Sequence, residues 1–254
     1  MTSLRAGALA LALLLAGTAA PAFAQTANEL VAKNLAARGG DAAFDALESV
    51  KFNGMLIFPG DFQLQYEEVR TKAGDVRVDA SLQGLTLVQA WDGKSGWRIN
   101  PFEGRKDAER MSDDEARSLA DTGSLRGPLQ NAAKQGATVT YLGREDFDGT
   151  NAYKLKVAEK DGDEFVYLLD PDSMLEIKMT ETRKVRGAPQ VFEYEYGDYE
   201  KVAGVYFPMS IESWSPGQGN NRQRTVIASG TANAPAPASL FAQPASPAAA
   251  SKGK

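Results

Sequence analysis

The chain has 254 residues and a net charge of −5, and it contains neither histidine nor cysteine. These absences exclude Ser-His and Cys-His nucleophile pairs, thiolate chemistry and the commonest zinc ligands. The acidic balance also argues against nucleic acid as a partner, because nucleic-acid binding needs a basic surface. We therefore expect a protein that holds a molecule rather than cleaves one, with no catalytic residues, no metal and no cofactor.

The first 24 residues have the pattern of an export signal. Arg5 supplies the positive start, an apolar run occupies positions 6–20, and a small-x-small sequence at positions 22–24 ends the segment. The apolar run is shorter than the ~20 residues that span a bilayer. We therefore predict that residues 1–24 are a signal peptide, cleaved before Gln25, and that the mature protein is soluble and periplasmic.

The next segment, residues 26–47, is predicted to be helical. Thr26-x-x-Glu29 is a capping box, in which the two side chains satisfy backbone amides at a helix start. Gly39-Gly40 ends this helix, and residues 41–47 are predicted to form a second, short one.

From residue 50 onwards, the apolar residues recur at every second position, as in strands, and no longer at the spacing of a helix. Apolar and polar residues alternate through residues 50–100, with turn sequences at 59–61, 73–75 and 92–93. A helical insertion follows, which starts at a second capping box, Ser112-x-x-Glu115, and ends at Gly136. Further strands are predicted at residues 138–142, 152–159, 164–170, 174–181, 190–197, 205–214 and 222–228.

This order of elements favours a mainly β (α+β) protein with one domain over residues 25–230. About eleven short strands in succession indicate one strongly curved antiparallel sheet. The apolar stripes of the two helical segments need a surface to cover, and the concave face of the sheet is the natural one. Dense packing is the usual state of such an interior, so the pattern alone leaves open whether this face holds a filled core or a cavity. Residues 231–254, rich in Ala, Pro and Ser, are predicted to be a disordered tail.

One short stretch favours the cavity. An Asp-Gly-Lys turn at positions 92–94 is followed by Trp97 and then by Asn-Pro-Phe at positions 100–102. The stretch resembles the LolA family of periplasmic lipoprotein carriers, in which the same residues follow one another after the first strands and before a helical insertion. The resemblance implies a single incomplete antiparallel β-barrel with a helical lid, which encloses an apolar cavity for acyl chains.

The resemblance also suggests which residues form the site. Trp97 and Ile99 share one face of a strand, and Phe102 lies just beyond its end. The expected residues of the cavity wall or rim are Trp97, Ile99, Phe102, Leu64, Tyr66, Phe52 and Leu56, and those of the lid are Leu119 and Leu129. LolA has an Arg-Pro pair whose arginine latches the lid. Residues 76–84 here lack such a pair, which leaves Arg70 and Arg77 as the candidates for a latch.

The function that this resemblance implies is that of a periplasmic carrier, a monomer that moves a lipoprotein or lipid toward the outer membrane. Membrane-bound donor and acceptor proteins are candidate further partners. Two alternatives remain open at this point. One is an RseB-like sensing module with the same fold, and the other is a hydrolase that uses two carboxylates.

Overall fold

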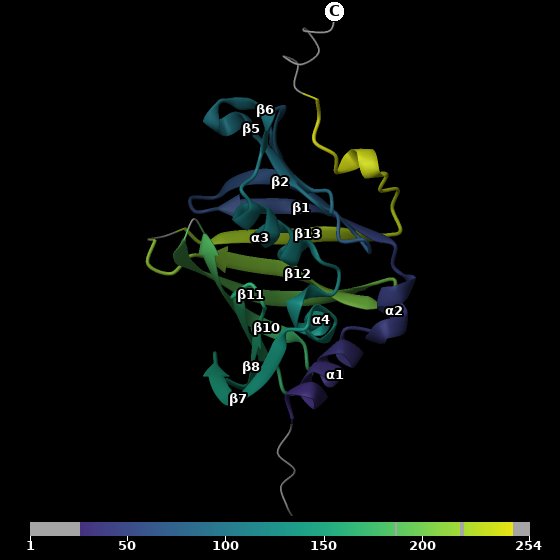
Figure 1. Cartoon of the computed structure of the whole chain (residues 1–254), viewed down its shortest axis with the longest axis vertical. Coiled ribbons are helices and arrows are strands. Elements are labelled where there is room, and N and C mark those ends of the chain that lie inside the picture. The colour runs from purple at the N-terminus through teal and green to yellow at the C-terminus, as the bar shows by residue number, and fades with distance from the viewer. Residues whose placement is uncertain (1–25, 186, 219–220, 246–254) are drawn as a thin grey trace, which may run out of the picture.

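The computed structural model describes residues 26–185, 187–218 and 221–245, so the predicted signal peptide lies outside the described residues. A single sheet of thirteen antiparallel strands dominates the fold, in the order β6-β5-β4-β3-β2-β1-β13-β12-β11-β10-β9-β8-β7. The sheet curves without closing, since β6 and β7 are its two edges (Figure 1). The predicted fold class, a mainly β open barrel with a helical lid, is confirmed. The strands are β1 (Ser49–Phe58), β2 (Phe62–Thr71), β3 (Val76–Leu82), β4 (Leu85–Trp91), β5 (Gly96–Asn100), β6 (Arg105–Arg110), β7 (Thr138–Phe147), β8 (Thr150–Ala158), β9 (Glu164–Leu169), β10 (Glu176–Val185), β11 (Ala188–Val202), β12 (Val205–Trp214) and β13 (Gln223–Ala232).

The helices begin where the capping sequences predict. Thr26 caps α1 (Ala27–Ala37) and Ser112 caps α3 (Asp113–Gly123), and both capping boxes are complete in the structure. The other helices are α2 (Gly40–Ala46), α4 (Gly127–Gln135) and two short 3-10 helices, η1 (Pro101–Glu103) and η2 (Ala238–Leu240). None of the helices in the described part of the chain is long and apolar enough to cross a membrane.

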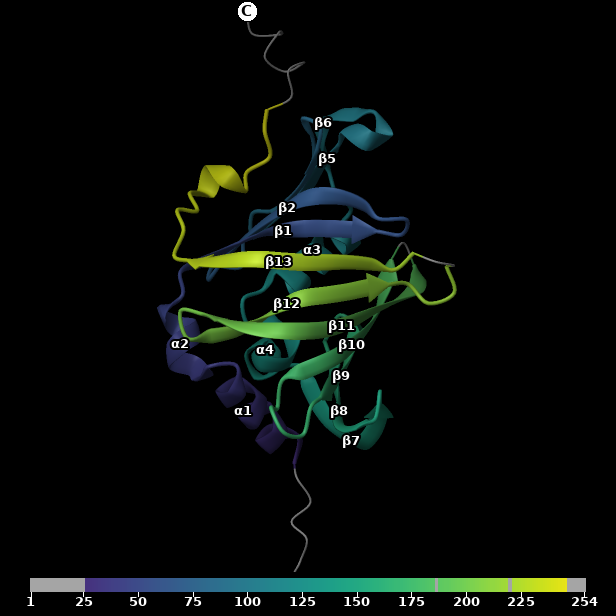
Figure 2. The ribbon, with the colours of Figure 1, turned by 180° about the vertical axis from the view of Figure 1, so that it is seen from behind.

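Helices α3 and α4 and the link between them, residues 113–135, form a lid over the concave face of the sheet. Helix α3 packs against β3, β4, β5 and β10, while α4 packs against β7, β8, β9 and α1. The opposite, convex face is seen from behind (Figure 2). Gly123 ends α3 directly against β3, where a Cβ atom would overlap the side chain of Val76. The lid thus rests on both halves of the sheet, of which one runs from β6 to β1 and the other from β13 to β7.

A β-bulge bends the sheet at its centre. Strand β1 pairs with β2 on one side and with β13 on the other, and its register with β13 shifts between Asn53 and Gly54. A side chain at position 54 would collide with the backbone oxygen of Val226, so only glycine fits there. This close approach contributes to the curvature that makes one face concave.

The described chain keeps a defined structure from residue 231 to residue 245. Strand β13 continues to Ala232, and the C-terminal segment, residues 233–245, turns back across the convex face of β3, β5 and β6. Phe241 is only 1% exposed there. The expectation of a disordered tail from residue 231 is therefore wrong for residues 231–245, because one aromatic side chain and backbone hydrogen bonds fix a segment of low overall hydrophobicity. Residues 246–254 lie outside the described residues.

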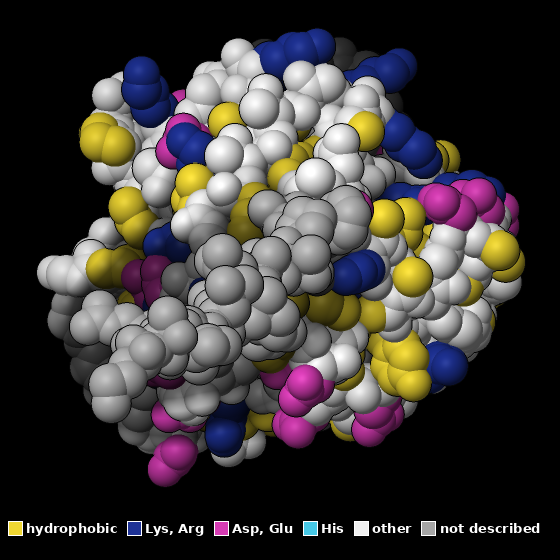
Figure 3. All heavy atoms as spheres, turned by 90° about the horizontal axis from the view of Figure 1, so that it is seen from below, with side chains coloured by type: hydrophobic (Ala, Val, Ile, Leu, Met, Phe, Trp, Pro, Cys, Tyr) yellow, Lys and Arg dark blue, Asp and Glu magenta, His cyan; other side chains and the backbone are white. Residues whose placement is uncertain are grey.

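The described surface at the α1 end of the molecule carries charges of both signs. Figure 3 shows Lys and Arg side chains interspersed with Asp and Glu and with hydrophobic groups, not gathered into a basic stripe. The described part of the surface in this view therefore shows no basic stripe of the kind that nucleic-acid binding needs.

Candidate functional site

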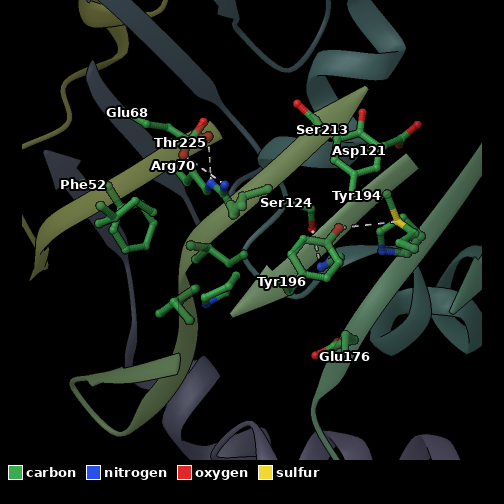
Figure 4. A pocket seen from close by; sticks show the side chains of 18 of the residues that line it. Phe52, Glu68, Arg70, Asp121, Ser124, Glu176, Tyr194, Tyr196, Ser213 and Thr225 are labelled. Carbon is green, nitrogen blue, oxygen red and sulfur yellow. Dashed lines mark hydrogen bonds and ion pairs between the residues drawn. The ribbon is translucent and has the colours of Figure 1, made fainter. Parts of the chain in front are cut away.

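A cavity of about 350 Å³ lies between the concave face of the sheet and the lid. The lid contributes Leu119 from α3 and the residues that link α3 to α4, and the sheet contributes side chains from both of its halves. Figure 4 shows side chains from opposite walls pointing into this common space. The apolar part of the lining comprises Phe52, Leu56, Val78, Leu119, Leu125, Pro128, Phe165, Met179, Phe207, Pro208, Ile211 and Ile227.

One wall of the cavity holds a buried ion pair on β2. Glu68 and Arg70 are two residues apart on the strand, so both point to the concave face. Arg70 donates from Nε to Oε1 and from Nη2 to Oε2 of Glu68, each at 2.9 Å, and the Tyr66 hydroxyl donates to Glu68 at 2.8 Å. Burial tends to lower the pKa of Arg70, but the attraction and hydrogen bonds of Glu68 outweigh it and leave that pKa raised. The pair is charged and tightly held.

The opposite wall holds a second ion pair, which joins the helices to the sheet. Arg38, at the end of α1, donates to Glu176 of β10 at 3.0 Å, and Gln130 of α4 donates to the same carboxylate at 2.6 Å. Tyr199 of β11 also donates to Glu176. Burial tends to raise the pKa of Glu176, and the charge of Arg38 with these hydrogen bonds brings it below its usual value. The cluster joins α1 and α4 to strands β10 and β11 at this end of the cavity.

A third cluster ties the lid to β10. Arg183 is 2% exposed and forms ion pairs with Asp121 of α3 at 3.2 Å, with Asp163 at 3.4 Å and with Glu181. Burial raises the pKa of Asp121 to about 6, although the charge of Arg183 opposes the shift. Among the described residues, no group of acidic side chains is arranged to hold a metal ion.

Several of the residues predicted for the cavity do line it. Phe52 and Leu56 of β1, Tyr66 of β2 and Leu119 of the lid are all part of the wall. Arg70, one of the two candidates for a latch, also faces the cavity, and its carboxylate partner is Glu68 of its own strand.

The remaining predicted residues lie elsewhere. Trp97 is 1% exposed but faces the convex side, where its Nε1 donates to the backbone oxygen of Phe241 at 2.6 Å. Ile99 shares that face and packs against the same small core. Arg77, the other candidate for a latch, is there too, with its guanidinium over the Trp97 ring and an ion pair to Asp79.

Three more predicted positions are outside the cavity lining for different reasons. Phe102 is 42% exposed in η1. Leu64 pairs with Leu56 across β1 and β2 and is buried, yet it is not one of the residues that line the cavity. Leu129 is fully buried in the core between α1, α4 and β8, so it anchors the lid without reaching the cavity.

Sequence reasoning missed the polar groups of the wall. The spacing Glu68-x-Arg70 places two opposite charges on one face of a strand. The other members of that face, Phe62, Leu64 and Tyr66, are apolar or aromatic. This break in an apolar face was a usable signal for a buried pair. The contribution of Glu176 and Arg38 had no such signal, because 138 residues separate the two side chains.

Comparison with solved structures identifies the architecture. A LolA superfamily protein from Nitrosomonas europaea matches with a TM-score of 0.60 and 13% identity, over 86% of this chain and 98% of its own. A putative outer membrane lipoprotein-sorting protein domain from Vibrio parahaemolyticus matches with a TM-score of 0.56 and 10% identity, over 84% of this chain and 94% of its own. The fold is LolA-like.

A third match is a DUF1329 family protein from Desulfovibrio piger, with a TM-score of 0.53, 11% identity, and coverage of 86% of this chain and 98% of its own. Neither the protein-family models nor the curated proteins include a match to this sequence. At such low identity the shared feature is the LolA-like fold, a curved sheet with helices over its concave face.

Proposed function

We propose that this protein is a periplasmic carrier that holds an apolar chain of a lipid or lipoprotein in the cavity beneath its lid and moves it toward the outer membrane. The observation that carries the proposal is the cavity itself, because interiors of this size usually pack without a void. Its apolar side chains come from both halves of the sheet and from the lid. The LolA-like fold and the export pattern of residues 1–24 support the same assignment.

The energetics suit an apolar chain. Each buried methylene contributes ~0.8 kcal/mol, so a chain of moderate length binds usefully without any covalent step. The cavity volume of about 350 Å³ lies near the lower end of the ~300–1,000 Å³ typical of small-molecule sites. The cavity thus suits a single chain or one small molecule, and a larger lipid anchor requires the lid to move.

The test begins with the purified mature protein. Organic extraction followed by mass spectrometry is expected to release a lipid in near-stoichiometric amount, and the delipidated protein is expected to bind the neutral fluorophore N-phenyl-1-naphthylamine. A protein that is empty on extraction and also fails to bind the fluorophore would contradict the proposal.

A filled cavity gives the matched control. Ile211→Trp places a large ring in the cavity wall and is expected to abolish binding of the fluorophore. Val226→Trp places the same ring on neighbouring β13, at an exposed position that does not line the cavity, and is expected to leave binding unchanged. Equal loss of binding in both variants would mean that the ligand occupies another site.

A further inference from the structure

Two tyrosine hydroxyls in the cavity wall have no strong hydrogen-bond partner within the part of the chain that the structure describes. Tyr167 is 4% exposed and lines the cavity, and its hydroxyl has no hydrogen-bond partner among the described residues. The Tyr196 hydroxyl reaches only the sulfur of Met179, at 3.7 Å. A sulfur atom is a weak acceptor. Both donors are therefore available to a ligand that enters the cavity.

The two hydroxyls belong to one region of the wall. Met179 of β10 lies directly across from Tyr167 of β9 in the strand register, and the same Met179 accepts from Tyr196 of β11. Burial raises the pKa of both phenols, so both remain protonated donors at neutral pH. Arg38 and Arg70 lie within electrostatic range of Tyr196 and oppose this shift, so Tyr196 stands near both ion pairs of the wall.

The charges of the cavity wall are already balanced. Six charged side chains among the described residues line the cavity, three of each sign. Each is paired: Arg38 with Glu176, Arg70 with Glu68, Arg126 with Asp41 and Asp45, and Asp121 with Arg183. An anionic head group that enters this space loses its hydration and gains no free cation in return. A plain hydrocarbon, on the other hand, leaves both tyrosine donors unpaired.

We propose that the cavity selects an uncharged ligand that carries an oxygen acceptor, such as an ester or amide carbonyl, which accepts hydrogen bonds from Tyr167 and Tyr196. This inference rests on the proposed function and specifies its ligand. It predicts an acyl ester in preference to a free fatty acid anion or a hydrocarbon of similar size.

Competition experiments test the preference. Methyl decanoate, decanoate and dodecane are compared for their ability to displace N-phenyl-1-naphthylamine at pH 8, where the carboxylate is ionised. The ester is expected to compete at the lowest concentration. Tyr167→Phe and Tyr196→Phe are each expected to weaken ester binding about fivefold, as one hydrogen bond does, and to leave dodecane unchanged. Tyr206→Phe, outside the cavity lining, is the control and is expected to change neither.

The outcomes separate this inference from the proposed function. If the fluorophore binds and all three compounds compete equally, or decanoate competes best, the cavity exists but the inference is wrong. Unchanged ester binding in both cavity variants, with their folding confirmed by circular dichroism, overturns it as well. If the wild-type protein does not bind the fluorophore or any of the three compounds, the proposed function itself fails.

Discussion

Phe241 provides the sharpest test of the architecture, because its side chain is the buried anchor of the C-terminal segment, which hydrogen bonds also hold against the convex face. It is 1% exposed, and its backbone oxygen accepts the indole hydrogen bond of Trp97. Removal of a buried phenyl ring in a core costs ~3–5 kcal/mol. We expect Phe241→Ala to cost about 3 kcal/mol, near the lower limit, because a terminal segment relaxes more readily than a core strand.

The assay is urea unfolding, combined with acrylamide quenching of tryptophan emission. Phe241→Ala is expected to lower the midpoint of unfolding and to expose Trp97 to the quencher. Trp97→Phe keeps most of the buried area and removes the indole donor, so a loss of about 1 kcal/mol is expected. Phe102→Ala is the control, since Phe102 is 42% exposed and its loss should stay within ~0.5 kcal/mol.

Ligand binding completes this test. Both positions lie on the face opposite the cavity, so fluorophore binding by the folded fraction of Phe241→Ala and Trp97→Phe is expected to equal that of the wild type. An unchanged midpoint and unchanged quenching in Phe241→Ala would refute the packing of the C-terminal segment. Loss of binding in a folded Trp97→Phe variant would refute the assignment of Trp97 to the convex face.

Three further predictions concern the interior and the lid. Glu68→Gln is expected to lower the free energy of unfolding in urea by ~3–5 kcal/mol, because it leaves Arg70 charged and unpaired. The double variant Glu68→Gln with Arg70→Met should recover most of that loss. Equal stability of the single and double variants would contradict a buried pair. Burial and then the neighbouring aspartates raise the pKa of Glu159 to about 7. Its folded form therefore binds a proton that the unfolded form has released, and the unfolding free energy falls as pH rises from about 4.5 to about 7. Glu159→Gln should stabilise the protein at pH 8 and not at pH 4. The control Glu200→Gln, at an exposed position, should leave the stability unchanged at both pH values. The same gain in stability from Glu159→Gln at pH 4 and pH 8 would contradict the raised pKa. Gly123→Ala is expected to lower the midpoint of thermal unfolding, because the added methyl group overlaps a β3 side chain, and a rise in that midpoint would show that the lid has room to move there.

The sequence is sufficient to predict most of the helices and strands and the class of fold. Capping boxes located α1 and α3, because each requires two particular side chains three residues apart. Alternation located most strands. Alternation does not predict strand β6, because five of its six residues, RKDAER, are charged. An edge strand needs no apolar face.

The faces of the strands were harder to predict than the strands. The resemblance to the LolA family places Trp97 and Ile99 together in the cavity wall, yet a shift of one residue moves every side chain of a strand to the other face. The decisive fact, the C-terminal segment on the convex side, depends on Phe241 in a stretch of Ala, Pro and Ser whose composition is typical of disorder. The sequence therefore gives no indication that another segment covers Trp97 on the convex face.

The pairing of β1 with β13 also bears on the order in which we expect this molecule to fold. Strand β1 ends at Phe58, whereas β13, the partner along its second edge, begins only at Gln223. Hairpins such as β1–β2 and β11–β12 join neighbours in the chain and form early, whereas the two halves of the sheet join across a loop of more than 160 residues. Until then β1 and β13 each present a free edge, to which another chain can add. We therefore expect the junction at the centre of the sheet to form late in folding, and an incomplete chain to be most prone to aggregate at this point.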